Sequence, residues 1–206
     1  FGASTKWEGN KISIEPKIYS LPEVNYKYTV EADWSAASYW YAMAALSEEV
    51  DLHITGLKQN SLQGDAVLVD VFKSLGVKTE FTTNGIHLTK SKSLPQNFEF
   101  DFSNCPDIAQ TVAVVCAALK IPAVLSGLQT LKIKETDRIK ALEIELSKIN
   151  VLALENKSNQ IDITFPPALS NNSNSYTFSS YEDHRMAMSF APLSLVLDQV
   201  KIEDPE

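Results

Sequence analysis

Short runs of alternating apolar and polar residues, each followed by a longer apolar stretch, recur three times along the chain. The three segments are residues 28–46, 98–119 and 176–195. Each opens with alternating aromatic or β-branched residues, which predicts a strand, then passes an acidic residue and enters an apolar stretch typical of a helix. We therefore expect a strand followed by a helix at all three places.

A second pair of matching segments follows the first two predicted helices. Residues 52–88 resemble residues 123–163, and Gly56 corresponds to Gly127, 71 positions later. The Asn-Gly pair at 84–85 predicts a hairpin turn. Helical spacing within the later segment predicts an apolar stripe made of Ile139, Leu142, Leu146 and Ile149. Each repeat thus reads strand, helix, strand, helix, strand, strand over roughly 70 to 75 residues, which favours packed α/β units over a thin solenoid.

The repeat predicts a single partial domain of class α/β (α+β). Its parts are the end of one βαβαββ unit (1–20), a full unit (26–90), a second full unit (98–165) and the start of a further unit (176–206). The stretch 166–175, rich in proline, serine and asparagine, is predicted as the clearest loop.

The composition is that of an ordinary globular protein. The chain has 206 residues, 44% hydrophobic and 21% charged, and no apolar run approaches the roughly 18 residues of a membrane span. A net charge of -8 argues against a nucleic-acid surface. Cys105 and Cys116 lack the spacing of a zinc site, so we expect reduced cysteines in a cytoplasmic protein. Because Phe1 and Glu206 do not resemble natural termini, we expect a piece of a longer protein.

The nonapeptide KIKETDRIK concentrates cations in an acidic chain. It spans residues 132–140 and holds four basic side chains, two carboxylates and a threonine. Apolar and basic residues alternate over 131–134, which predicts the end of a strand. Thr136 or Asp137 is expected to cap a helix that begins near Arg138.

Three charged side chains of this stretch are expected to surround the helix N-terminus: Lys134, Glu135 and Arg138. Such an end presents free N–H groups and a partial positive charge, and added cations make it an anion site. The alternative is a solvated helix face whose ion pairs contribute about 0.3–0.5 kcal/mol each. Taken alone, the nonapeptide slightly favours this alternative.

Two further predicted helix starts carry titratable groups. Asp107 precedes an apolar stretch that we expect to be buried, so its surroundings can tune it for acid or base catalysis; the alternative is a carboxylate that only stabilises the helix. Arg185 stands at the start of another predicted helix, where it opposes the helix dipole. The alternative for its neighbour His184 is a partly buried ring bonded to Asp183 or to the backbone. Asp33 is interpreted as structural.

Four segments resemble the 5-enolpyruvylshikimate-3-phosphate (EPSP) synthase family. They read EADWSAASYW, NCPDIAQT, GLQTLKIKETDRIKALEIEL and SYEDHRMAMSFAPLSL, and their order and spacing match over nearly the whole chain. The resemblance implies βαβαββ units around a pseudo-threefold axis, in one of two similar domains with the active site between them. This chain would be most of the C-terminal domain, and the N-terminal domain of the same polypeptide would be its partner.

The family transfers the enolpyruvyl group of phosphoenolpyruvate to the 5-hydroxyl of shikimate 3-phosphate and releases phosphate. The resemblance implies a cytoplasmic enzyme of the shikimate pathway that is a monomer at full length and uses no metal or organic cofactor. No membrane or nucleic-acid partner is expected, and this chain alone is expected to be inactive. Two alternatives are an enolpyruvyl transferase acting on UDP-N-acetylglucosamine and a non-catalytic module that binds phosphate ligands.

By resemblance, two carboxylates are catalytic and the cations bind substrate. Asp107 resembles the proton acceptor that touches the shikimate ring, and Glu135 resembles the second acid–base group. Lys134 resembles a contact of the shikimate 3-phosphate. The implied phosphoenolpyruvate contacts are Arg138, Arg185 and His184. Thr130 stands where the family commonly has an asparagine, so this contact to shikimate 3-phosphate falls to a single hydroxyl.

Overall fold

The computed structural model describes most of the chain in five stretches. These are residues 3–18, 28–91, 93–156, 159–167 and 175–204. Most of the loop predicted at 166–175 therefore lies outside the described residues. The chain divides into two compact units, Phe1–Ala32 and Asp33–Glu206.

The first unit contains a single described hairpin. Strand β1 (Thr5–Glu8) pairs antiparallel with β2 (Lys11–Ile14), and every residue of both strands is exposed. Two-stranded hairpins are marginally stable in water without a further packing layer. The described part of this unit therefore contributes no buried core of its own.

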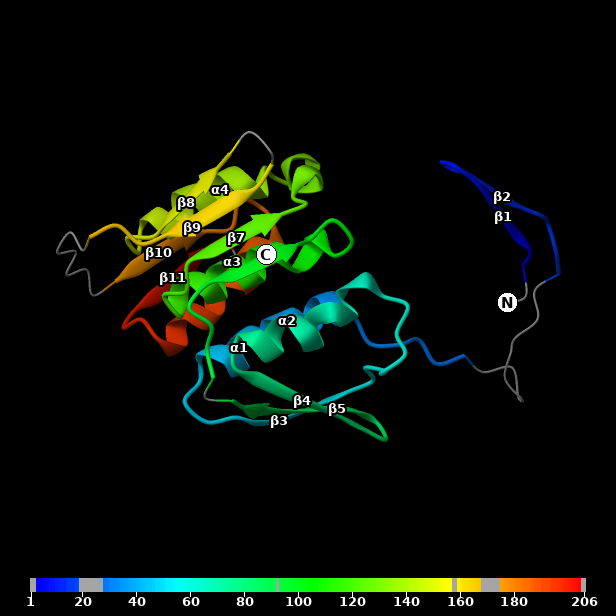
Figure 1. Cartoon of the computed structure of the whole chain (residues 1–206), viewed down its shortest axis with the longest axis horizontal. Helices are drawn as coiled ribbons and strands as arrows, with labels where there is room; N and C mark the ends of the chain where they lie inside the picture. The colour runs from blue at the N-terminus through cyan, green and yellow to red at the C-terminus, as the bar shows by residue number, and fades with distance from the viewer. Residues whose placement is uncertain (1–2, 19–27, 92, 157–158, 168–174, 205–206) are drawn as a thin grey trace. The chain divides into compact units, whose positions relative to one another are not determined.

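The second unit begins with a three-stranded antiparallel sheet covered by two helices (Figure 1). Its elements are α1 (Trp34–Leu46), β3 (Asp51–Thr55), a 3-10 turn η1 (Gly64–Val67), α2 (Leu68–Ser74), β4 (Val77–Thr82) and β5 (Gly85–Lys90). The strand order is β3-β5-β4. The hairpin predicted around 84–85 is confirmed, with Thr83 and Asn84 as the two loop residues.

A four-stranded sheet follows, with the predicted order of strand, helix, strand, helix, strand, strand. The elements are β6 (Phe98–Asp101), α3 (Ala109–Ala118), β7 (Ala123–Ser126), α4 (Arg138–Ser147), β8 (Leu152–Glu155) and β9 (Ile161–Thr164). The strand order is β6-β7-β9-β8, in which only the β6–β7 pair is parallel. Two 3-10 turns, η2 (Pro106–Ile108) and η3 (Gln129–Ile133), precede α3 and α4.

The last part of the second unit is a parallel pair of strands joined through a helix. Strand β10 (Tyr176–Ser179) pairs with β11 (Val200–Glu203). Helix α5 (His184–Phe190) lies between them in sequence and continues as the 3-10 segment η4 (Ala191–Leu195). The helix type changes next to Pro192, because proline cannot continue the α-helical hydrogen bonding.

Two local predictions were wrong. Residues 28–33 form no strand: Tyr28 and Val30 are exposed, and no described strand pairs with this segment. Residues 131–134 belong to η3 and its cap instead of a strand end. The preceding strand β7 already pairs with β6 and β9, so it offers no free edge, and an alternating pattern alone does not make a strand without a ladder partner.

The corresponding glycines of the two full units occupy equivalent backbone positions. Gly56 follows β3 with φ of 87° and Gly127 follows β7 with φ of 75°, a left-handed conformation that L side chains rarely adopt. A Cβ at Gly127 would also lie 2.2 Å from Oδ1 of Asp101. Close backbone approach and conformation therefore both require glycine there.

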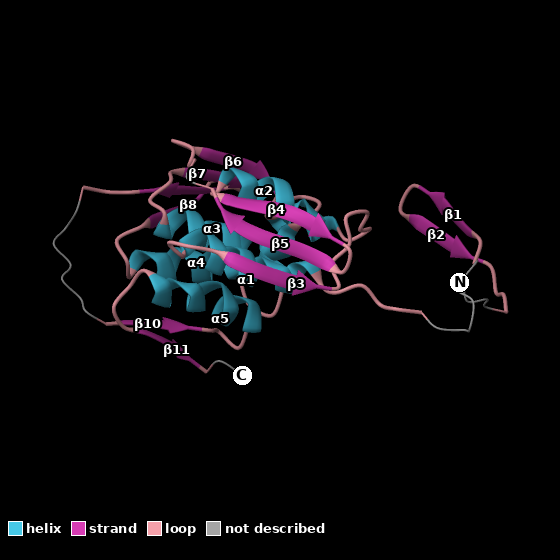
Figure 2. Cartoon of the chain, turned by 90° about the horizontal axis from the view of Figure 1, so that it is seen from below, coloured by secondary structure: helices cyan, strands magenta, loops and turns pink. Residues whose placement is uncertain are grey.

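Helices α1, α3 and α5 pack together between the sheets (Figure 2). Helix α3 is buried over nearly its whole length, as its apolar sequence predicts. One hydroxyl from each helix joins a buried chain: Oγ1 of Thr111 lies 3.2 Å from Oγ of Ser38 and 3.0 Å from Oγ of Ser189. Ser38 and Thr111 are 73 residues apart, the spacing of the sequence repeat. Repeated α/β units thus meet at a common helical centre.

None of the helices within the described stretches has the length and apolar character required to cross a lipid bilayer.

Replacing the central hydroxyl is expected to destabilise the fold. Thr111→Val leaves the buried hydroxyls of Ser38 and Ser189 without their shared partner, which costs about 1–3 kcal/mol in the free energy of unfolding. The triple variant S38A/T111V/S189A removes all three hydroxyls and is expected to lose less than the sum of the single changes. Urea unfolding measures both, with T82V on the exposed face of β4 as control. A T111V loss no larger than that of T82V would contradict the hydroxyl chain.

Candidate functional site

The start of α4 directs one arginine into the interior. Asp137 caps this helix, its carboxylate accepting from the backbone N–H of Lys140 at 3.1 Å, which confirms one of the two predicted caps. Arg138 is the first helical residue, and 1% of its side chain is exposed. The predicted stripe behind it is largely confirmed, because Ile139, Leu142 and Leu146 are buried.

Three carboxylates surround the Arg138 guanidinium. Its Nε donates to Oδ2 of Asp183 at 2.7 Å, its Nη2 donates to Oε2 of Glu135 at 2.7 Å, and its Nη1 lies 3.4 Å from Oδ1 of Asp107. A buried cation is costly to leave unpaired, and charge-assisted hydrogen bonds are among the strongest available to it. Arg138 therefore joins η2, the start of α4 and the start of α5.

Asp183 both caps α5 and neutralises Arg138. It is fully buried, and its Oδ1 accepts from the backbone N–H of Arg185 at 2.9 Å. The alternative of a partly buried His184 ring is wrong, because His184 is exposed, and the Asp183 carboxylate accepts from Arg138. The preceding Tyr181 has a left-handed backbone (φ of 57°) and donates from its hydroxyl to Oε1 of Glu145 on α4 at 2.7 Å. Helix α4 thereby holds the turn that delivers Asp183.

Asp107 lies in η2 and faces three cations. Its Oδ1 is 3.1 Å from Nζ of Lys134 and 3.4 Å from Nη1 of Arg138, and its Oδ2 is 3.7 Å from Nη2 of Arg185. Partial burial alone raises the pKa of Asp107. The hydrogen bond from Lys134 and the charges of Arg185, Lys134 and Arg138 outweigh burial, so its pKa lies below the ordinary value. Asp107 is therefore held as a carboxylate.

The cluster as a whole is electrically balanced. Three cations (Lys134, Arg138 and Arg185) face three carboxylates (Asp107, Glu135 and Asp183) at 2.7–3.7 Å. These cations stand next to the same oxygens that a divalent metal would need as ligands, so the cluster disfavours a metal centre. Its cations suit oxyanions instead, because guanidinium groups bind carboxylate and phosphate through paired hydrogen bonds.

Most of the expected site residues come together, and two do not. The cluster unites the five residues Asp107, Lys134, Glu135, Arg138 and Arg185. Thr130 in η3 and His184 at the start of α5 are both exposed. Among the described residues, neither takes part in the ion pairs of the cluster. Their roles in substrate binding stay predictions.

Four polar residues beside the cluster were not identified as candidate site residues from the sequence. They are Ser35, Tyr39, Asp65 and Gln110. Ser35 donates to Asp65, and burial raises the pKa of Asp65 above its ordinary value. The side-chain amide of Gln110 donates to the carbonyl of Asp107 at 2.6 Å. The sequence repeat does point to Asp65. It stands 72 residues before the cap Asp137, and other corresponding residues of the two units are 71 or 73 positions apart.

Comparison with known proteins gives one consistent result. A family model described as EPSP synthase (3-phosphoshikimate 1-carboxyvinyltransferase) matches residues 1–206. Proteins named 3-phosphoshikimate 1-carboxyvinyltransferase from Bacteroides fragilis and Neisseria meningitidis serogroup B are 43% and 34% identical over 100% of this chain, covering 49% and 46% of their own lengths. The chain spans about half the length of the curated relatives it matches.

A solved structure shares the fold. The EPSP synthase of Acinetobacter baumannii matches 100% of this chain with a TM-score of 0.69, over 48% of its own chain. Sequence identity in this comparison is 21%, so it supports the predicted α/β architecture of repeated units and nothing finer.

Removing the buried partner of Arg138 is expected to be strongly destabilising. Asp183→Asn keeps an oxygen that can cap α5 but leaves the buried guanidinium undercompensated, a loss of about 3–5 kcal/mol in the free energy of unfolding. Glu135→Gln is the matched control, because half of the Glu135 side chain is exposed (51%) and exposed pairs contribute about 1 kcal/mol or less. Urea unfolding compares the two, and equal losses would show that burial of the pair is unimportant.

Lys134→Gln is expected to raise the pKa of Asp107 toward its ordinary value of 3.8. Because the folded-state pKa is depressed, the pairing stabilises the fold above the unfolded-state pKa, and this contribution is lost as the pH falls through the folded-state pKa. The stability difference between wild type and K134Q should therefore be present above about pH 4 and fade in stronger acid. Carboxyl NMR titration and urea unfolding across this range measure both effects.

The control for this substitution is Lys132→Gln. Lys132 pairs with Glu155 at 2.5 Å instead of with Asp107, so the Asp107 pKa should stay depressed. If K134Q and K132Q gave the same Asp107 pKa as wild type, Lys134 would not be the source of the shift.

Proposed function

The chain belongs to the EPSP synthase family, and we propose that it forms one half of an active site that transfers the enolpyruvyl group of phosphoenolpyruvate to the 5-hydroxyl of shikimate 3-phosphate. The observation that carries this proposal is the convergence of Lys134, Arg138 and Arg185 on the Asp107 carboxylate at 3.1–3.7 Å. Both substrates carry phosphate, and the reaction moves protons. Such a site needs cations and carboxylates side by side.

The charge balance of the cluster supports an incomplete site. Its three cations are already offset by three carboxylates, so two phosphate-bearing substrates require further positive charge. The chain spans about half the length of its relatives. We assign the missing cations to the N-terminal half of the full-length protein, and we expect the 206-residue chain alone to show no turnover.

Substrate binding and base strength are coupled at Asp107. Lys134 and Arg185 can turn toward the anionic groups of the substrates, Lys134 toward the phosphate of shikimate 3-phosphate and Arg185 with Arg138 toward phosphoenolpyruvate. Asp107 then loses contacts that lower its pKa, while partial burial, which raises the pKa, remains. The carboxylate becomes a better proton acceptor once the substrates are in place.

The two carboxylates then divide the proton transfers. In the addition step Asp107 accepts the proton of the 5-hydroxyl, and the hydroxyl oxygen bonds to C2 of phosphoenolpyruvate. A protonated Glu135 delivers its proton to the methylene carbon, so the carbon–carbon double bond becomes single. In the elimination step that carbon returns a proton to Glu135, the double bond forms again, and the C–O bond to phosphate breaks and releases phosphate. The two carboxylates stand in different surroundings, since Glu135 is half exposed and Asp107 is more enclosed. Holding both substrates in line lowers the activation free energy of the reaction by about 7–11 kcal/mol.

The cysteines argue against the sugar-nucleotide alternative, whose enzymes typically use a cysteine as an acid. Both cysteines are buried free thiols. Burial raises the pKa of Cys105 to about 11 and that of Cys116 to about 12, which makes them poor acids near neutral pH. Reduced thiols also fit the cytoplasmic location that we propose for the enzyme.

The decisive experiment uses the full-length protein. Phosphate release from phosphoenolpyruvate is followed with shikimate 3-phosphate and, in parallel, with UDP-N-acetylglucosamine. D107N and E135Q are expected to lower kcat by about 10²–10⁴-fold, the range typical of acid–base groups. The control E99Q alters an exposed carboxylate on β6 and should leave kcat unchanged.

Each other outcome has a defined meaning. Release only with the sugar nucleotide would overturn the substrate assignment. No release with either acceptor, together with undiminished ligand binding by D107N and E135Q, would identify a binding module instead of an enzyme. Release by the 206-residue chain alone would refute the half-site.

A further inference from the structure

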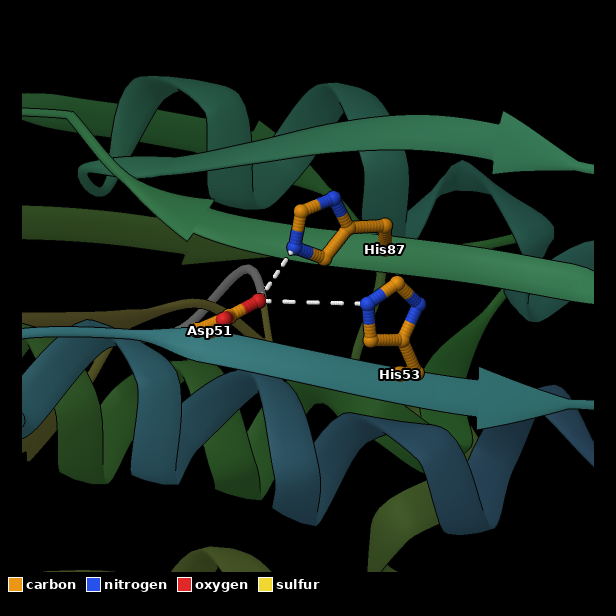
Figure 3. A group of neighbouring side chains, drawn as sticks. All are labelled: Asp51, His53 and His87. Carbon is orange, nitrogen blue, oxygen red and sulfur yellow. Dashed lines mark hydrogen bonds and ion pairs between the residues drawn. The ribbon is translucent and has the colours of Figure 1, made fainter.

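Two of the three histidines of the chain face each other on the open side of the β3-β5-β4 sheet (Figure 3). His53 on β3 and His87 on β5 are directly opposed in the strand register. Their rings are stacked, with centroids 4.1 Å apart and planes 3° apart. Asp51 stands two residues before His53 and so on the same face of the sheet. Its Oδ1 lies 2.7 Å from Nε2 of His87 and 3.8 Å from Nε2 of His53.

We propose that Asp51, His53 and His87 bind a divalent transition-metal ion of the zinc type. One ligand atom from each residue lies within 4.8 Å of the other two. This site shares no residue with the charged cluster at the starts of α4 and α5, and it goes beyond the proposed transfer reaction.

The distances suit such an ion after small side-chain rotations. Zinc binds imidazole nitrogen and carboxylate oxygen at about 2.0–2.2 Å, which places tetrahedral ligand atoms about 3.3 Å apart. The Asp51–His87 separation of 2.7 Å is shorter than this and the Asp51–His53 separation of 3.8 Å is longer. His53 has 65% of its side chain exposed, so solvent leaves it room to turn toward the ion.

The ligand types select the class of metal. Two imidazoles and one carboxylate suit Zn²⁺, Co²⁺, Ni²⁺ and Cu²⁺, whereas Mg²⁺ and Ca²⁺ prefer oxygen ligands. Three protein ligands leave a fourth position for water on the solvent side. Rigid antiparallel pairing holds the two histidines opposite each other, so little ordering is required on binding.

A neighbouring carboxylate lies in the same row but is already paired with a lysine. Glu80 on β4 is the register partner of His87, which places His53, His87 and Glu80 in one row across the sheet. Lys78 donates to Glu80 at 2.6 Å, which offsets the charge of Glu80, so Glu80 is not one of the three proposed ligands. A bound ion would join β3 to β5 across 34 residues of sequence and raise the stability of this sheet.

The test titrates the tag-free 206-residue chain with Zn²⁺ by calorimetry and with Co²⁺ by visible absorption. One Zn²⁺ per chain is expected, with a rise in Tm. H53Q and H87Q should each weaken binding by at least about 10-fold and abolish the rise in Tm. Co²⁺ should give the ligand-field bands of a nitrogen and oxygen site without a thiolate charge-transfer band, and Mg²⁺ should not compete.

The third histidine provides the matched control. His184 is exposed at the start of α5, and H184Q removes the only other imidazole while leaving the proposed ligands intact. Binding that is lost equally in H184Q, or that survives in H53Q and H87Q, would overturn the site. Absence of saturable Zn²⁺ binding by the wild-type chain would overturn it as well. Unchanged Tm values of the metal-free variants check that they fold.

Discussion

Arg138 carries its charge at the start of α4 with 1% of its side chain exposed, and a charge in that position requires carboxylates around it. Asp183, Glu135 and Asp107 supply them from three separate elements. The starts of α3, α4 and α5 are therefore drawn to one place. The low local dielectric makes these pairs strong, and it also makes each partner costly to remove.

The need for carboxylates around Arg138 also brings together the residues of the candidate site. Two oxygens of Asp183 accept hydrogen bonds from Nε and Nη2 of Arg138, while the only contact of Nη1 within the described stretches is that to Asp107 at 3.4 Å. This Nη1 edge is the part of the guanidinium that a substrate anion can take with the least loss. A structural ion pair on one side and a replaceable one on the other would allow a single arginine to support the fold and, as proposed, to bind ligand.

Sequence patterns revealed what depends on local or repeated features. The buried helix α3, a cap at Thr136 or Asp137 and a repeat of roughly 70 to 75 residues were all visible in the order of residues along the chain. The pairing of Arg138 with Asp183 was not visible in the sequence. The two residues are 45 positions apart, and a periodic pattern does not indicate which distant carboxylate pairs with a buried cation. The predicted strand at 28–33 failed for the same reason, since a strand exists only where a partner strand is in reach.

The buried hydroxyls of Ser38, Thr111 and Ser189 also set how far the three central helices can slide. A shift of one residue along a helix axis is about 1.5 Å, which would lengthen and misalign the contacts of 3.0 Å and 3.2 Å. The three hydroxyls therefore tie together the first half of α1, the first turn of α3 and the last turn of α5. Asp107 and Asp183 stand at the N-terminal ends of α3 and α5, so their separation also depends on contacts that these helices make in the buried interior.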